Sequence, residues 1–530
     1  MTASSSLPVA AAHRPIVMSE HGMVVAGHHR AAEAGAAMLR SGGNAMDAAV
    51  AAAAALAIAI PHMNGIGGDA IALWADRKGG VTAINGSGAV AGNLSADALR
   101  RQGWTEMPPR GPLTVTVPGV VAAWGQALER FGTRSFAEVL RFAIDLAEEG
   151  VRIDRSLLDF FNGTEYVGLA AEFPGLAEIF GAPGSHRLGG VLKQPEAAAT
   201  LRMLARDGWR SFYDGALAQA WLAEAREAGV LIEATDLASH TTVCEPALAV
   251  AWRGRQVHVA PPNSQGLALL MLLGLAEAQP AAPPADGSDP LIDPVAYLSR
   301  KVAAFAARDA YCADPRRVDM PSDLLAPQRL SAIELAAGPN IARSGGGDTS
   351  TLVVVDADGN AVSWVQSLFD AFGSGVTCRR HGIVLHNRAM LERLDDHPVR
   401  GLRGGYRPFH TLCPALVTGP NGVELTIATP GDHGQPQALF QVIRRHFEQG
   451  LDIQAAIEWP RLRHDDGLEV MLEERCPPSW DRALQAAGWK VRRLDPWSRL
   501  MGGVNAIRRW EDGLLMGGAD PRRSCYAVVP

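Results

Sequence analysis

The residues best suited to chemistry in this chain are a hydroxyl residue and the glycines directly before it. Gly345 to Gly347 precede Asp348 and Thr349, and the strand-favouring run Val353 to Val355 follows closely. Cleavage of the Asp348–Thr349 bond would give Thr349 a free α-amine with a pKa of about 7.7–8.0, next to its own nucleophilic hydroxyl. A flexible loop before an ordinary hairpin explains the same run, so this stretch alone leaves both interpretations open.

Two strands are expected to position Thr349. The valine run and Ala361 to Leu368 are separated by the turn Asp356-Ala357-Asp358-Gly359-Asn360, which predicts a hairpin. Pro315 to Ser344 has a weak structural pattern, and a long, loosely structured approach is what a cleavage site requires.

Length, charge and cysteine usage exclude several classes of protein. The 530 residues have a net charge of −7 with interspersed charges, so no basic stripe for nucleic acid and no acidic tail is present. The six cysteines are scattered and form no CxxC pair, which favours a reducing compartment. The 15 histidines show no ligand spacing, so neither a metal nor another cofactor is predicted.

The first sixty residues begin with a polar, proline-containing segment and end with an apolar run. Met1 to Pro15 is rich in Ser, Ala and Pro and is expected to be disordered, without a secretory signal, which favours a cytoplasmic location. Ala48 to Ile60 is the most apolar run, but it is too short to span a bilayer and predicts a buried helix. The sequence therefore predicts no membrane partner.

Regular elements are readable along much of the chain. His29 to Arg40 predicts a helix, and Asn44 can cap a second helix to about Ile60. Ala70 to Trp74 and Val81 to Asn85 predict strands after the glycine-rich turn Gly65 to Asp69. That turn follows a helix and has no GK[ST] ending, so a phosphate-binding loop is rejected. Strands grouped with strands and helices with helices predict a layered α+β domain.

Several motifs, in their order and spacing, resemble the γ-glutamyltranspeptidase family of N-terminal nucleophile hydrolases. They are Gly43-Asn44-Ala45-Met46-Asp47-Ala48-Ala49-Val50, Pro61 to Asp69, Thr349 to Gly375, and Gly517 to Arg522. The resemblance extends from about His28 to the C-terminus. It implies a four-layer αββα sandwich, a large subunit over residues 16–348 and a small subunit over residues 349–530. The two subunits would form one composite domain after processing and could pair as a dimer of heterodimers.

The resemblance also implies roles for individual residues. Thr349 matches the threonine that acts in self-cleavage and then as the catalytic nucleophile. Ser367 falls where the family has a second threonine that hydrogen-bonds the nucleophile. Gly431 and Asp432 match the turn whose backbone N–H groups form the oxyanion hole. Asp432 replaces a glycine, and its carboxylate would disfavour a developing oxyanion unless it points away.

The motifs depart from the family where a γ-glutamyl group would bind. The arginine that holds its α-carboxylate is missing from Asn85-Gly86-Ser87-Gly88, and the serine pair of R-P-x-S-S is replaced in Arg407-Pro408-Phe409-His410-Thr411. Phe369 replaces an asparagine, and the aspartate that holds the α-amine is replaced around Met390 and Leu391. An unpaired head group in a partly buried pocket costs several kcal/mol, so γ-glutamyl substrates should bind poorly.

The motifs are most similar to the oxamate amidohydrolase branch, which implies hydrolysis of a small oxalic acid monoamide in purine or allantoin nitrogen breakdown. The candidate substrate pocket consists of Ser87, Asn387, Arg407, His410 and Thr411. His410 fits a structural role equally well, and Arg407 fits a surface ion pair. Two further functions stay open: a γ-glutamyl or other acylase, and an unprocessed binding or scaffold protein.

Overall fold

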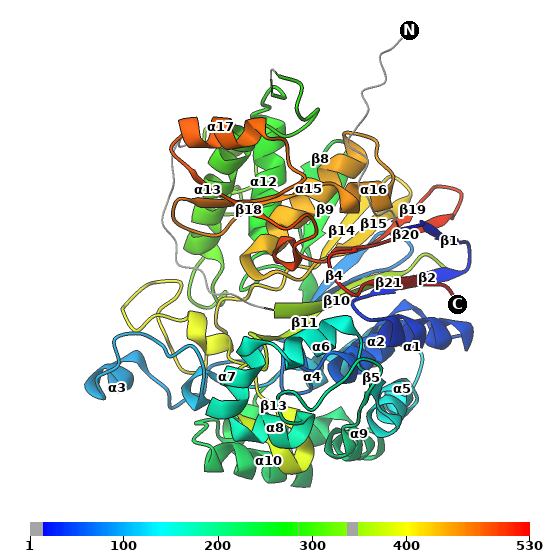
Figure 1. Cartoon of the computed structure of the whole chain (residues 1–530), viewed down its shortest axis with the longest axis vertical. Helices are drawn as coiled ribbons and strands as arrows, with labels where there is room; N and C mark the ends of the chain where they lie inside the picture. The colour runs from blue at the N-terminus through cyan, green and yellow to red at the C-terminus, as the bar shows by residue number, and fades with distance from the viewer. Residues whose placement is uncertain (1–13, 285, 336–347) are drawn as a thin grey trace.

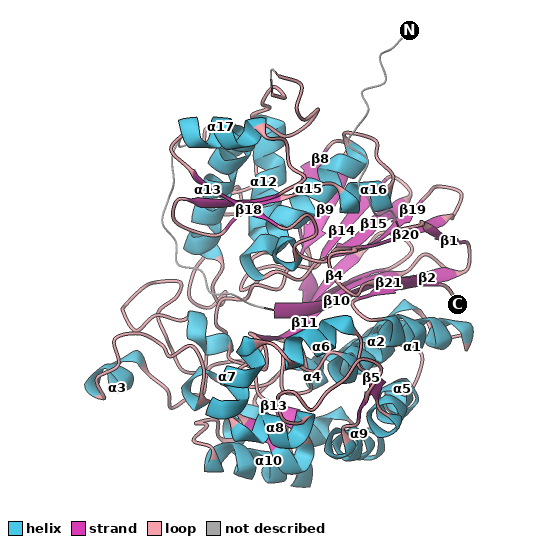
Figure 2. Cartoon of the chain, in the orientation of Figure 1, coloured by secondary structure: helices cyan, strands magenta, loops and turns pink. Residues whose placement is uncertain are grey.

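Two antiparallel seven-stranded sheets form the centre of the molecule (Figures 1 and 2). The computed structural model describes residues 14–284, 286–335 and 348–530, with only the backbone of Asp348. The first sheet has the order β1 (Val17–Ser19), β20 (Leu515–Ala519), β19 (Asn505–Arg509), β15 (Gly422–Ala428), β14 (Ala415–Gly419), β9 (Arg255–Val259) and β8 (Leu248–Trp252). The second has the order β21 (Tyr526–Val528), β2 (Gly22–Ala26), β10 (Asp348–Asp356), β11 (Ala361–Phe369), β3 (Asp69–Ala75), β4 (Val81–Asn85) and β7 (Val243–Pro246).

Helices cover the outer face of each sheet (Figure 1). Below the second sheet lie α1 (His29–Arg40), α2 (Ala45–Ala59), α4 (Val120–Phe131), α5 (Phe136–Glu149), α6 (Arg155–Phe161), α7 (Thr164–Glu172), α8 (Pro174–Phe180), α9 (Pro195–Asp207) and α10 (Ala216–Glu227). Above the first sheet lie α12 (Gly266–Ala278), α13 (Pro294–Tyr311), α15 (Gln435–Phe447), α16 (Ile453–Glu458) and α17 (Ser479–Ala486).

The remaining elements are short. Three small sheets consist of β5 (Val151–Arg152) and β6 (Val191–Leu192), of β12 (Thr377–Cys378) and β13 (Ile383–Val384), and of β16 (Leu462–His464), β17 (Glu469–Glu473) and β18 (Lys490–Leu494). The short helices are α3 (Ala96–Arg101), α11 (Ala234–Ala238) and α14 (Pro327–Ser331), and the 3₁₀ turns are η1 (Pro112–Thr114), η2 (Trp209–Phe212), η3 (Arg379–His381), η4 (Arg388–Leu391), η5 (Asp432–Gly434) and η6 (Arg499–Met501).

Strand β10 is apolar on both faces because it has a layer above and below it. Leu352 and Val354 pack into the core shared with the helices around α2, whereas Val353 and Val355 pack into the core between the two sheets. Alternate side chains of a strand point to opposite faces, so one valine-rich run serves both cores. The predicted αββα sandwich is confirmed.

Helix α2 supports this hairpin from below. The Asn44 side chain accepts hydrogen bonds from the N–H groups of Met46 and Asp47, and Asp47 completes a capping box. Every residue from Ala45 to Ala59 is buried, as predicted for this apolar run. Within the described ranges, the structure has no helix with the length and apolarity that a membrane crossing needs.

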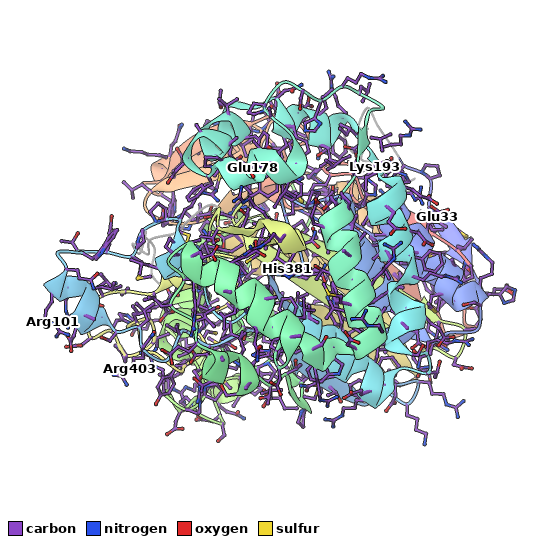
Figure 3. All side chains as sticks on the ribbon, turned by 90° about the horizontal axis from the view of Figure 1, so that it is seen from below. Glu33, Arg101, Glu178, Lys193, His381 and Arg403 are labelled. Carbon is purple, nitrogen blue, oxygen red and sulfur yellow. The ribbon has the colours of Figure 1, made fainter. Side chains whose placement is uncertain are left out.

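The lower helical layer is seen from below in Figure 3. His381 lies near its middle, where its Nδ1 contacts the carboxylate of Glu224. Arg101, in α3, and Arg403 lie at one edge of this view, and Ser95 forms an isolated bridge with Arg403. The projection formed by α3 is therefore attached to the chain that precedes Arg407.

The strand ends place the predicted site residues at one end of both sheets. In the second sheet Asp348 pairs with Phe369, and Ser367 pairs with Asp69. In the first sheet Ala415 pairs with Ile427, so the segment before β14 and the turn after β15 lie at the same end. The predicted disorder of Met1 to Pro15 falls mostly on residues 1–13, which are outside the described ranges. The predicted approach from Pro315 to Ser344 is described up to residue 335 and contains the short helix α14, and its last part, 336–344, is outside those ranges.

Candidate active site

Thr349 is a buried residue at the start of β10. Its Oγ1 donates a hydrogen bond to Ser367 Oγ at 3.3 Å. The register between β10 and β11 shifts between Asp348 and Ser350, so Thr349 lies opposite two residues of β11, Ser367 and Leu368, at a bulge in β11. A cavity of about 60 Å³ adjoins Thr349 and also touches Pro430. The nucleophile candidate therefore shares an enclosed space with the turn after β15.

Ser367 is held by the backbone as well as by Thr349. Its Oγ accepts a hydrogen bond from the N–H of Phe369 at 2.7 Å. Phe369 itself has a φ of 79°, a region that bulky residues seldom adopt. The sharp bend at the end of β11 thus fixes the oxygen that faces the Thr349 hydroxyl.

The turn after β15 presents two unused backbone donors. Gly431 has a φ of 121° and Asp432 a φ of 50°. Neither N–H donates to an acceptor among the described residues, although the Gly431 carbonyl accepts from Gly434 N–H at 2.8 Å. Adjacent N–H groups held in a bent backbone can bind an oxyanion, and the oxyanion-hole role of this pair stays a prediction.

The Asp432 side chain is fully buried, and neither carboxyl oxygen has a hydrogen-bond partner within the described part of the chain. Burial raises the pKa of this carboxyl to about 7, although the charges of Arg463 and Arg388 oppose the shift. At neutral pH a large fraction of Asp432 is therefore uncharged, which reduces the conflict with a developing oxyanion.

A second buried carboxylate, Asp69, orders the loops on the other side of Thr349. Its Oδ1 accepts from the N–H groups of Gly88 and Gly119, and its Oδ2 lies 3.2 Å from His410 Nε2. Burial would raise the pKa of Asp69, but His386 and the hydrogen bond from His410 lower it to about 2.

His410 is neutral in this arrangement. Its Nδ1 accepts from Leu412 N–H at 3.3 Å, which leaves Nε2 as the donor to Asp69. Burial, reinforced by the charge of Arg388, lowers the pKa of His410 to about 3. The donor that could bind a substrate carboxylate is thus used by Asp69, and the substrate-binding role of His410 stays a prediction.

Thr411 lies beside a residue that the sequence interpretation did not select. Arg388 Nη1 donates to Thr411 Oγ1 at 3.0 Å, and the Arg388 guanidinium lies 4.3 Å from the centre of the Phe369 ring. The Nε and Nη2 groups of Arg388 have no partner among the described residues, and the side chain is fully buried. Burial lowers the pKa of Arg388 to about 10, so it stays charged at neutral pH. Two buried donors on a cation are a site for an anion.

Asn387 lies next to this arginine but uses its polar groups elsewhere. Its Nδ2 donates to Asp370 Oδ2 at 2.7 Å and to the Pro109 carbonyl at 2.9 Å. Its Oδ1 accepts from Asp370 N–H at 3.2 Å. These bonds fix the loop between β11 and η4, and a contact of Asn387 with substrate stays a prediction.

Arg407 and Ser87 form a separate group. Arg407 donates to the carbonyls of Ser87 at 2.9 Å and Thr241 at 2.6 Å, and it lines a cavity of about 550 Å³ that also touches Asn85. Ser87 Oγ donates to Asn85 Oδ1 at 2.7 Å. The cavity beside Thr349 has different lining residues, so the structure does not bring Arg407 and the nucleophile candidate into one cavity.

Sequence reasoning missed Arg388, Asp69 as a site residue, and Gln265. The only signal for Arg388 is weak, because Ala389, Met390 and Leu391 follow it but the polar His386 and Asn387 precede it directly. No comparable signal marks Gln265, whose Nε2 donates to both the Thr411 carbonyl at 2.6 Å and the Asp432 carbonyl at 2.8 Å.

The stacked sheets between helical layers define an N-terminal nucleophile hydrolase sandwich. The crystal structure of cephalosporin acylase from Bacillus halodurans superimposes with a TM-score of 0.89 at 30% identity, covering 100% of this chain and 99% of that chain. The family model for gamma-glutamyltranspeptidase matches residues 31–529, so the chain belongs to this family and is a hydrolase.

Two relatives match over nearly their whole length. Glutathione hydrolase-like YwrD proenzyme from Bacillus subtilis (strain 168) is 36% identical over 522 residues, which is 96% of this chain and 98% of that protein. Oxamate amidohydrolase proenzyme from Klebsiella pneumoniae is 36% identical over 532 residues, which is 96% of this chain and 99% of that protein. No group of three or more His, Cys, Asp or Glu suited to a metal occurs in the described ranges.

Proposed function

We propose that this chain cleaves itself before Thr349 and then uses Thr349 to hydrolyse a small amide with a carboxylate beside the amide carbonyl, with oxamate as the substrate. The supporting observation is Arg388, a buried cation with two unused donors. Gln265 donates to the carbonyls of Thr411 and Asp432, Arg388 donates to Thr411 Oγ1, and the charge of Asp432 acts on Arg388, which supports an anion site near the candidate oxyanion hole.

The position of this cation favours oxamate over a γ-glutamyl group. In oxamate the carboxylate is bonded directly to the reacting carbonyl carbon, so its anchor must lie beside the oxyanion hole. In a γ-glutamyl group the α-carboxylate lies several bonds further away. The name of the Klebsiella relative is consistent with the first arrangement. The breakdown of purine or allantoin nitrogen and a cytoplasmic location stay predictions.

The reaction proceeds by acyl transfer in two halves. Thr349 Oγ attacks the amide carbon while the freed α-amine takes the hydroxyl proton, and the N–H groups of Gly431 and Asp432 bind the oxyanion. Ser367 orients the hydroxyl. Ammonia leaves after protonation, and water then attacks the Thr349 ester, giving the acid and restoring the hydroxyl. No group outside the chain is required for these proton transfers.

The first experiment tests processing. Denaturing electrophoresis and N-terminal sequencing should show two fragments, with the smaller one beginning Thr-Ser-Thr-Leu. Thr349→Ala should remain one chain. Thr351→Ala is the matched control, because it makes the same change two residues along β10. An intact wild-type chain that behaves like Thr349→Ala would contradict the proposal and favour a non-catalytic scaffold.

The second experiment tests the substrate. Oxamate and a γ-glutamyl anilide are compared on the processed enzyme, and oxamate should give the larger kcat/KM. Arg388→Gln should cleave itself but lose about 100-fold or more in kcat/KM for oxamate, because one anchored charge contributes about 3 kcal/mol. The exposed Arg403→Gln should match the wild type. Preference for the anilide would instead support a γ-glutamyl or other acylase.

A further inference from the structure

Two buried residues of the site carry polar atoms without a hydrogen-bond partner, acceptor oxygens on one residue and donor N–H groups on the other. Asp432 has two carboxyl oxygens without a partner, and Arg388 has Nε and Nη2 without a partner, within the part of the chain that the structure describes. Both side chains are about fully buried. An unsatisfied buried polar group destabilises the protein, so a bound group that satisfies both residues would be favoured.

The side chain of Gln265 connects the Asp432 turn to Thr411, the residue that contacts Arg388. Gln265 Nε2 donates to the Asp432 carbonyl and to the Thr411 carbonyl, and Thr411 Oγ1 accepts from Arg388 Nη1. Gln265 Oε1 in turn accepts from Arg308 Nη1 at 3.4 Å. The Asp432 turn and the Arg388 guanidinium are therefore placed by the same amide group, although they are far apart in sequence.

The surroundings of Asp432 permit both of its charge states. The groups that face it are Asp370 after β11, Arg388 in η4, His433 in η5, and Arg463 and Asp465 at β16. Burial is the main cause that brings its pKa to about 7, with Asp465 and Asp370 raising it and the arginines lowering it. Burial, reinforced by the charge of Arg308, holds the pKa of His433 well below its usual value, so its ring adds no positive charge near pH 7.

We propose that Asp432 binds the substrate carboxylate as a neutral acid, donating its O–H to one carboxylate oxygen while Arg388 binds the carboxylate through Nε and Nη2. Substrate binding is then coupled to the uptake of one proton by Asp432. This inference rests on the proposed function only for the presence of a carboxylate on the substrate.

The charge of Asp432 determines whether the affinity for a carboxylate rises or falls with pH. An ionised Asp432 would repel the incoming carboxylate and also the oxyanion that forms at its own N–H. The neutral acid removes both repulsions and makes a charge-assisted O–H···O⁻ hydrogen bond. Because the proton is bound more tightly in the complex, affinity is highest below the pKa of free Asp432 and falls up to tenfold for each pH unit above it.

The test measures proton uptake directly with oxalate as the probe. Processed wild-type enzyme is titrated calorimetrically with oxalate at pH 8 in two buffers of different ionisation enthalpy. Asp432 should contribute about 0.9 proton per oxalate, because a group with a pKa of about 7 is mostly ionised at pH 8. Asp432→Asn, which is isosteric and cannot titrate, should therefore take up about 0.9 fewer protons per oxalate than the wild type. Any uptake left in the variant belongs to other groups, such as the Thr349 α-amine.

Two readouts make each outcome decisive. Self-cleavage of Asp432→Asn, and of Asp432→Gly, which suits the positive φ, shows that each variant folds. Equal proton uptake by the wild type and Asp432→Asn, or failure of oxalate to bind the processed wild type, would overturn the inference. Proton-coupled oxalate binding without oxamate hydrolysis would refute the proposed substrate and leave the inference standing.

Discussion

At the scale of single residues, Ser367 Oγ is a hydrogen-bond acceptor that helps to orient the Thr349 hydroxyl. Ser367 Oγ receives hydrogen bonds from both the Thr349 hydroxyl and the Phe369 N–H. It therefore links the nucleophile candidate to the bend in β11 that also places the Phe369 ring against Arg388. The Thr349 hydroxyl and Arg388, the proposed substrate anchor, thus both contact the last three residues of β11.

Ser367→Ala should slow self-cleavage and lower kcat by about 10- to 100-fold. The change leaves a buried N–H unsatisfied and the Thr349 hydroxyl unoriented, a loss of about 1–3 kcal/mol. Ser367→Thr keeps the oxygen and should retain most activity. Ser363→Ala is the matched control in the same strand, because Ser363 Oγ donates to Ile427 O and lies away from Thr349. Equal losses in both alanine variants would argue that Ser367 acts only through stability.

At the scale of elements, α2 is the support on which the Thr349 hairpin rests. Gln366, one residue before Ser367, donates from Nε2 to the Ala53 carbonyl in α2 at 2.8 Å. The other end of the hairpin is attached as well, since Asp356 Oδ2 accepts from Ala45 N–H at 2.9 Å. Displacement of α2 would therefore move both ends of the nucleophile hairpin.

Asp47→Asn should destabilise the fold by about 2–4 kcal/mol. The buried carboxylate accepts from Asn44 N–H at 2.8 Å, Thr133 Oγ1–H at 2.6 Å and Arg134 N–H at 3.0 Å, and hydrogen bonds to charged groups are the stronger kind. Denaturant unfolding in the Thr349→Ala background, which is expected to remain one chain, is the measurement. Glu138→Gln alters the exposed capping box of α5 and should cost about 1 kcal/mol or less. A similar loss in both variants would contradict this account of α2.

At the scale of the whole molecule, sequence on each side of Thr349 contributes to both sheets. Strand β10 pairs with β2 on one side and β11 on the other, while β8 and β9 extend the sheet that contains β14 and β15. Both cores are therefore shared across the predicted cleavage point. Buried histidines are distributed through the molecule, and we expect them to lower the stability of the fold in acid.

Stability should fall steeply as the pH drops from about 6.5 towards 4. Burial lowers the pKa to about 4, or to about 3 for His410, in a set of six histidines: His28, His240, His258, His410, His446 and His464. The unfolded chain binds protons on these rings in that range and the folded chain does not, so unfolding is favoured.

Carboxyl groups whose pKa is raised oppose this effect, and they are fewer than the histidines. Burial raises the pKa of Asp370 to about 6, of Asp432 to about 7 and of Glu392 to about 8, so each of these favours the folded state as pH falls. The six histidines outweigh the three carboxyl groups, because each proton changes the free energy of unfolding by about 1.4 kcal/mol per pH unit. Thermal unfolding of Thr349→Ala between pH 4 and 7 should show the melting temperature dropping below pH 6.5, and a flat profile would contradict the balance.

Local patterns in the sequence determined the elements and the position of the nucleophile candidate. The helix from His29 to Arg40, the capped helix from Asn44 and the strands on each side of Asp356 are confirmed, because capping, apolar alternation and turn chemistry act between residues close in sequence. The order of motifs was likewise sufficient for the family and the layered fold.

Only the tertiary structure decided which side chains meet at the end of the sheets. Arg388, Gln265 and Asp432 come from three distant segments, and hydrogen bonds through Thr411 connect these segments without any spacing in the sequence that reveals it. The structure also places Arg407 at a cavity whose lining residues differ from those of the cavity at Thr349. Whether a buried polar atom has a partner depends on every neighbouring element, and sequence alone does not record that.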